Sequence, residues 1–83
     1  MRSESVFIRA REALELHEDA VSPGENILLV DDLLATGGTA AAAVKLLDEL
    51  GANIVGISVL IELEFLSGRA LLEGHPVTAI VTY

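Results

Sequence analysis

Three stretches of the chain have the apolar pattern of β-strands. Residues 27–30 (ILLV) and 54–61 (IVGISVLI) are nearly continuous apolar runs bounded by polar residues. This pattern is typical of parallel strands covered on both faces. Residues 77–83 (VTAIVTY) are rich in β-branched side chains and predict a last strand.

A helix is predicted between the first two of these strands. Residues 40–50 contain strong helix formers, with Ala43, Leu46, Leu47 and Leu50 at helical spacing, and Gly51 is placed to end the helix. Residues 27–61 therefore predict one β-α-β unit with a right-handed crossover.

The N-terminal part shows a weaker strand pattern. Residues 5–8 (SVFI) are β-prone, and residues 13–17 (ALELH) alternate apolar and polar side chains as a half-buried strand does. The short polar link between them predicts an antiparallel hairpin. Residues 22–26 (SPGEN) then predict a turn, and residues 62–72 a turn with one or two helical turns.

The predicted fold class is therefore α/β: one domain over residues 1–83, with a mostly parallel sheet, a β-α-β unit and an N-terminal antiparallel hairpin. A chain of 83 residues allows one small domain of modest stability. The strands at residues 27–30 and 54–61 need cover on both faces, so we expect a homodimer or larger homo-oligomer.

The composition limits the binding partners and the cellular compartment that we expect for this protein. The net charge of −8, from 13 acidic and 5 basic residues, argues against nucleic acid or anionic membrane as a partner. The absence of cysteine excludes a disulfide framework and a thiolate nucleophile, and favours an intracellular, cytoplasmic protein. We see no signal peptide and no transmembrane segment in the sequence.

The candidate chemistry follows the strand at residues 27–30. Asp31 and Asp32 stand at its carboxyl end, where open α/β sheets bind ligands. Taken alone, two such acids are more often a solvated strand end or a helix cap. The Thr36-Gly37-Gly38-Thr39 loop favours a ligand site instead, because a helix begins after it whose first amides lack partners and attract an anion. Together they predict a site for a sugar phosphate with vicinal hydroxyls.

A Gly-Gly pair alone is usually an ordinary turn. Here Thr36 and Thr39 flank the pair, and their hydroxyls can add to the amide donors of a phosphate site. The spacing lacks the lysine of the Walker motif and the Gly-x-Gly-x-x-Gly of dinucleotide folds, so neither of those nucleotide sites is supported.

Residues 30–39 (VDDLLATGGT) resemble the phosphoribosyl-pyrophosphate (PRPP) binding motif of type I phosphoribosyltransferases, in the version found in adenine phosphoribosyltransferases. The resemblance extends to residues 14–20 (LELHEDA), to residues 61–63 (IEL) and to Gly68 with Arg69. It implies a partial or shortened form of the type I fold, corresponding to the C-terminal half. It also implies the substrate-binding residues Asp31, Asp32, Leu33, Leu34, Ala35, Thr36, Gly37, Gly38 and Thr39.

By this resemblance, Asp31 and Asp32 are also the candidate catalytic residues. They would hold the ribose hydroxyls of PRPP, while Mg²⁺ bridges those hydroxyls and the pyrophosphate. No residue is assigned as a direct metal ligand. Positive charge builds on the ribose ring as pyrophosphate leaves, and nearby carboxylates stabilise that charge.

The implied function is transfer of the 5-phosphoribosyl group from PRPP to adenine, giving AMP and pyrophosphate in purine salvage. Complete family members are longer. Their pyrophosphate loop, flexible catalytic loop and adenine-recognising hood precede the position of Leu14. The alternative is therefore a non-catalytic module, or a truncated remnant, that binds PRPP or a nucleotide phosphate. The sequence leaves open which of these the chain is, and which base it prefers.

Overall fold

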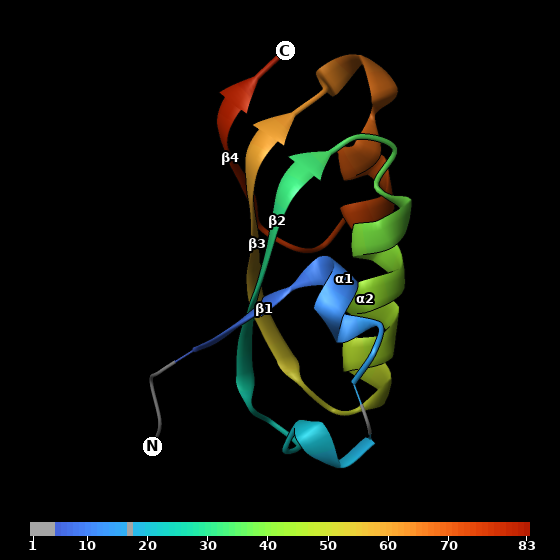
Figure 1. The fold of residues 1–83 in the computed structure, drawn as a ribbon, viewed down its shortest axis with the longest axis vertical. Coiled ribbons are helices and arrows are strands. Elements are labelled where there is room, and N and C mark those ends of the chain that lie inside the picture. Colours follow the sequence, from blue (N-terminus) through green and yellow to red (C-terminus); the bar gives the residue numbers. More distant parts are fainter. Residues whose placement is uncertain (1–4, 17) are drawn as a thin grey trace.

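Four parallel strands form one sheet in the order β1-β2-β3-β4 (Figure 1). The computed structural model describes residues 5–16 and 18–83. The elements in chain order are β1 (Val6–Arg9), α1 (Ala10–Ala13), η1 (Glu18–Ala20), β2 (Asn26–Leu34), α2 (Gly38–Glu49), β3 (Asn53–Glu62), η2 (Glu64–Leu66), η3 (Gly68–Leu72) and β4 (Val77–Thr82).

The predicted β-α-β unit is confirmed as β2-α2-β3. The helix ends before Gly51, whose φ of 82° is the left-handed conformation that ends many helices. The last strand and the short helical turns after β3 are also confirmed. Strand β2 is longer than the apolar run predicts, because its pairing with β3 continues from Asp31 to Leu34.

The predicted antiparallel hairpin at the N-terminus is wrong. Strand β1 pairs with β2 in parallel, and the chain enters helix α1 directly after it. Ala10 and Ala13 lie one helical turn apart and are both fully buried, in the layer where α1 contacts α2. Burial of these two alanines favours a helix here more strongly than the alternating pattern from Ala13 onward favours a strand. His17, at the end of the expected second strand, lies outside the described residues.

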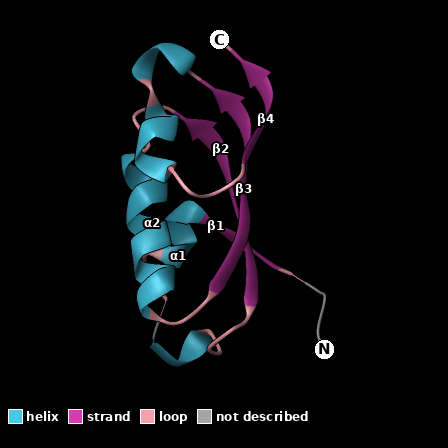
Figure 2. Ribbon diagram, turned by 180° about the vertical axis from the view of Figure 1, so that it is seen from behind, coloured by secondary structure: helices cyan, strands magenta, loops and turns pink. Residues whose placement is uncertain are grey.

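Helices α1 and α2 cover one face of the sheet (Figure 2). The buried core lies between these two layers and is built from small and aliphatic side chains: Ala10, Ala13, Val21, Ile27, Leu29, Leu34, Ala40, Ala43, Val44, Leu47, Ile57, Val59 and Leu72. None of the helices in the described part of the chain is long and apolar enough to cross a membrane.

The opposite face of the sheet carries no helix within residues 5–16 and 18–83 (Figure 2). Phe7, Leu60 and Ile80 are 71%, 49% and 72% exposed. We expected β2 and β3 to be covered on both faces of the sheet. Helices cover only one face, because the helices of the described chain all pack against the same side.

An ion pair fastens η3 to the end of β3. The Nε of Arg69 donates to Oε2 of Glu62 at 2.7 Å, and its Nη1 donates to the carbonyl of Val77 at 2.9 Å. The Glu62 side chain is only 5% exposed, and the hydrogen bond from Arg69 holds the pKa of its carboxyl below the ordinary value. One guanidinium thus links β3, η3 and β4.

Candidate functional site

The loop between β2 and α2 presents backbone amides at the carboxyl end of the sheet. Gly37 is the N-cap of α2 with a φ of 86°, and no side chain caps the helix. The Gly37 carbonyl accepts the Ala41 N–H at 2.8 Å, so the amides of Gly38, Thr39 and Ala40 come before the first intrahelical bond. These amides and the positive end of the helix dipole make a site that favours an anion.

This loop packs directly against the backbone of Gly68 at the start of η3. A Cβ atom added to Gly37 would lie 2.5 Å from the Gly68 carbonyl oxygen. A Cβ atom added to Gly68 would lie closer still to the Ala35 carbonyl oxygen, and 3.1 Å from the Gly37 nitrogen. Two facing glycines therefore let the loop and η3 touch through their backbones, which fixes the direction of the loop amides.

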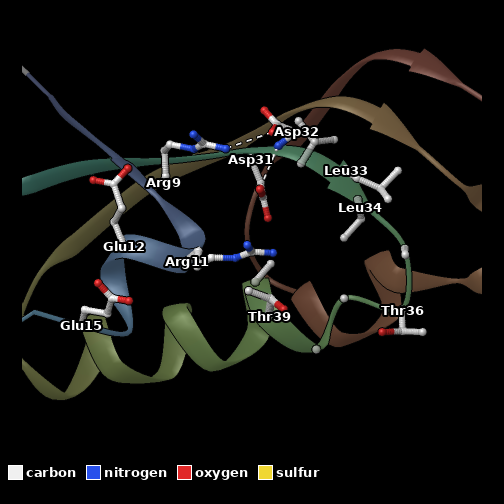
Figure 3. Close-up of a pocket in the computed structure, with 15 residues that line it drawn as sticks. Arg9, Arg11, Glu12, Glu15, Asp31, Asp32, Leu33, Leu34, Thr36 and Thr39 are labelled. Carbon is white, nitrogen blue, oxygen red and sulfur yellow. Dashed lines mark hydrogen bonds and ion pairs between the residues drawn. The ribbon is translucent and has the colours of Figure 1, made fainter.

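Asp31 and Asp32 lie on opposite faces of the sheet. Both belong to β2, and side chains alternate along a strand. Asp31 pairs in register with Val59, a core residue, so it lies on the face that carries α2. Figure 3 shows Asp31 directed toward Thr39 and Asp32 directed to the other side of the strand.

The two carboxylates also have different partners. Oδ1 of Asp31 accepts the backbone N–H of Asp32 at 2.9 Å, which orients this carboxylate. Oδ2 of Asp32 forms an ion pair with Arg9 at 2.9 Å, and the Asp32 side chain is 78% exposed. Asp31 is therefore the carboxylate better placed to reach a ligand held at the loop amides.

A cavity of about 540 Å³ joins these features. All nine residues predicted for the site from Asp31 to Thr39 line it, with Ala40 and Val59. Four further lining residues come from the N-terminal segment: Arg9, Arg11, Glu12 and Glu15 (Figure 3). These four were not among the predicted site residues, because the parallel pairing of β1 with β2 is what brings them to this edge.

The described residues contain no group of three or more His, Cys, Asp or Glu side chains that could hold a metal ion. The lining carboxylates are spread over α1, the turn after it and both faces of β2. A divalent cation at this site would therefore depend on oxygens of a bound ligand, which is the usual way in which Mg²⁺ is held beside phosphates.

The comparisons with known proteins all indicate the same family. Residues 3–78 match the phosphoribosyl transferase domain model. The chain is 57% identical over 70 residues to the adenine phosphoribosyltransferase of Symbiobacterium thermophilum, covering 84% of this chain and 41% of that protein. The crystal structure of adenine phosphoribosyltransferase from Thermoanaerobacter pseudethanolicus superposes with a TM-score of 0.80 at 44% identity, covering 82% of this chain and 40% of that one.

A third relative carries ligands. The adenine phosphoribosyltransferase of Trypanosoma brucei, solved in complex with AMP, pyrophosphate and ribose 5-phosphate, matches with a TM-score of 0.72 at 29% identity, covering 77% of this chain and 31% of that one. The present chain thus spans about 40% of the length of the curated relatives it matches.

Proposed function

This chain belongs to the phosphoribosyl transferase domain family, and from that premise we propose that it binds PRPP and AMP at the cavity between β2 and α2. The observation that carries the proposal is the loop at Gly37. It turns the uncapped start of α2 toward a cavity that also contains Asp31. Amide donors for a phosphate and a carboxylate acceptor for ribose hydroxyls therefore meet in one site.

In this proposal the 5-phosphate lies against residues 35–39, where the loop amides and the hydroxyls of Thr36 and Thr39 are the donors. Asp31 accepts hydrogen bonds from the ribose hydroxyls. Its negative charge also stabilises the positive charge that develops on the ribose ring when pyrophosphate leaves. Asp32 is paired with Arg9 on the other face of the sheet. It supports the strand end and has a less direct role in ligand binding than Asp31.

Mg²⁺ enters this proposal as part of the substrate. When bound, it neutralises pyrophosphate charge and makes pyrophosphate a better leaving group. The residue of this chain that would stand nearest to it is Asp31, the acceptor beside the ribose. This fits the charge of the cavity, because Glu12, Glu15, Asp31 and Asp32 outnumber Arg9 and Arg11 there.

The proposed reaction is transfer of the phosphoribosyl group to adenine, as the names of the relatives indicate. A second candidate function is PRPP or AMP binding without turnover. It is favoured by the cavity lining, in which the loop amides and Asp31 are groups that bind a phosphate and a ribose. Calorimetric titration with PRPP and Mg²⁺, followed by an AMP-formation assay with adenine, distinguishes the two. Binding with AMP formation supports the enzyme, binding alone supports the module, and no binding of PRPP or AMP contradicts both.

The two carboxylates are expected to respond differently to neutralisation. Asp31→Asn should weaken AMP binding about tenfold, because a charged acceptor for the ribose hydroxyls is lost, while inorganic phosphate binding stays within about twofold. Asp32→Asn, the matched control, should change AMP affinity by less than about threefold. Isothermal titration with both ligands checks this. Equal losses for AMP and phosphate in Asp31→Asn would place its role in the fold and not at the sugar.

We also propose that the uncovered sheet face drives self-association, as a homodimer or larger assembly. Its exposed apolar side chains, Phe7, Leu60 and Ile80, would otherwise remain in water. Light scattering at micromolar concentration is expected to give a mass above the monomer value of 8.8 kDa. Ile80→Asp should shift the protein toward monomer, whereas Lys45→Asp on the exposed side of α2 should not. A folded wild-type monomer would contradict the proposal.

A further inference from the structure

The Glu62–Arg69 ion pair lies next to the contact between η3 and the loop at residues 35–39. Glu62 pairs in register with Leu34, the last residue of β2 before the loop begins. Arg69 directly follows Gly68, whose backbone contacts the loop at Gly37. One charged residue is therefore found where the loop leaves the sheet, and the other is the chain neighbour of the glycine that supports the loop.

Arg69 connects the start of η3 to two strands. Its Nε donates to Glu62 at the end of β3, and its Nη1 donates to the carbonyl of Val77 at the start of β4. A guanidinium is planar and its donors have fixed directions, so these two bonds limit where the backbone at residues 68–69 can lie. Leu72, which is 1% exposed, anchors the other end of η3 in the core. The short helix is thus held at both ends.

The turn that leads into Gly68 has an uncommon backbone conformation. Ser67 has a φ of 55°, the one positive φ of a non-glycine residue in the part of the chain that the structure describes. This conformation is unfavourable for an L-residue, so surrounding contacts must hold it. The two bonds of Arg69 and the bond from the Ser67 N–H to the Glu64 carbonyl are such contacts. Loss of the Arg69 bonds would let the turn relax and move Gly68 away from Gly37.

Stability alone explains this ion pair poorly. Glu62 is buried, and its Oε1 has no hydrogen-bond partner among residues 5–16 and 18–83. A buried carboxylate oxygen without a partner costs free energy, and apolar side chains of similar size can often replace a buried ion pair without loss. Apolar side chains cannot, however, supply directed bonds from η3 to β3 and β4. The feature that only the charged pair provides is therefore the position of η3.

We propose that the Glu62–Arg69 pair positions the loop amides of the anion site, acting through Gly68. The inference rests on the proposed function, because that function places the 5-phosphate at residues 35–39. The bonds of Arg69 fix Gly68, Gly68 supports Gly37, and the amides after Gly37 then keep the directions that a phosphate requires. Neither Glu62 nor Arg69 lines the cavity, so both are positioning residues.

The double variant Glu62→Met with Arg69→Met tests the proposal, because it separates the position of η3 from the cost of an unpaired buried charge. Most of the stability should remain, but no side chain of the pair then directs η3 onto β3 and β4. Affinity for AMP and for inorganic phosphate should fall by the same factor, roughly tenfold, because misaligned hydrogen bonds weaken steeply. Calorimetric titration measures both, at a temperature where circular dichroism shows folded protein. Arg69→Lys should recover part of this affinity, since it restores the charge without the planar fork.

The matched control is Leu47→Ala, which removes a buried side chain from the half of α2 distant from the loop. It should lower stability more than the double variant does, yet leave AMP affinity within about twofold. Wild-type AMP affinity in the double variant would overturn the inference. Affinity losses that follow stability across all variants, Leu47→Ala included, would also overturn it, because the pair would then act only on folding. Wild-type protein that binds neither AMP nor phosphate would instead contradict the proposed function, and this inference with it.

Discussion

Gly37→Ala is expected to reduce AMP and phosphate affinity by at least about 100-fold. The residue has a φ of 86°, a conformation that costs a non-glycine residue roughly 1–2 kcal/mol. The added Cβ would also lie 2.5 Å from the Gly68 carbonyl oxygen, so the loop or η3 must move. Because the proposed anion site consists of backbone amides with fixed directions, that movement would remove the site itself. Isothermal titration with AMP and with phosphate measures the loss.

The neighbouring glycine gives the matched control. A Cβ added to Gly38 would meet only the Thr36 hydroxyl oxygen, at 3.8 Å, and Gly38 does not have a positive φ. Gly38→Ala should therefore keep AMP affinity within a fewfold and leave the thermal midpoint unchanged or slightly higher, since alanine favours the helix that begins there. If both variants lose binding equally, the backbone contact with Gly68 is not what shapes the loop.

Arg69→Met is expected to produce the largest loss of stability, roughly 3 kcal/mol in the free energy of unfolding. It leaves the Glu62 carboxylate buried without its partner, and breaking a buried pair costs about 3–5 kcal/mol. The lower end applies because the Arg69 side chain is half exposed. A chain of 83 residues has a total stability of roughly 4–12 kcal/mol, so this loss would remove about a quarter to three quarters of it. Urea unfolding followed by circular dichroism measures it.

The double variant Glu62→Met with Arg69→Met separates the charge effect from packing. It removes both charges, so the loss in the free energy of unfolding should be well below that of Arg69→Met alone. An equal or larger loss in the double variant would show that the Val77 contact or the shape of the arginine matters more than the ion pair.

The same pair predicts how stability depends on pH. The pKa of Glu62 is lowered in the folded protein by the hydrogen bond from Arg69. Its contribution is therefore fully present above the unfolded-state pKa of about 4.3, and is lost as the pH falls through the lower folded-state pKa. Urea midpoints measured from pH 6 downward should fall in wild type. They should fall less in the double variant, which lacks this carboxyl.

The sequence predicted the central unit well because its signals are local. Strand β2, helix α2 and strand β3 follow from apolar runs, helical spacing and Gly51, each set by residues close together in the chain. The conformation of the loop at Thr36–Thr39 is likewise set locally, since Gly37 supplies the positive φ that starts α2. The resemblance of residues 30–39 to a phosphate-binding motif, and the family it implies, were also contained in the sequence.

Tertiary structure decided the parts that depend on pairing between distant segments. Parallel pairing of β1 with β2 replaced the expected hairpin and brought Arg9 and Arg11 to the cavity, about twenty residues from Asp31 in the chain. Continued pairing of β2 with β3 kept Asp31 and Asp32 in the strand, and alternation then placed them on opposite faces. The contact of Gly37 with Gly68 likewise exists only after η3 folds back onto the loop, because no local pattern encodes which backbones will touch.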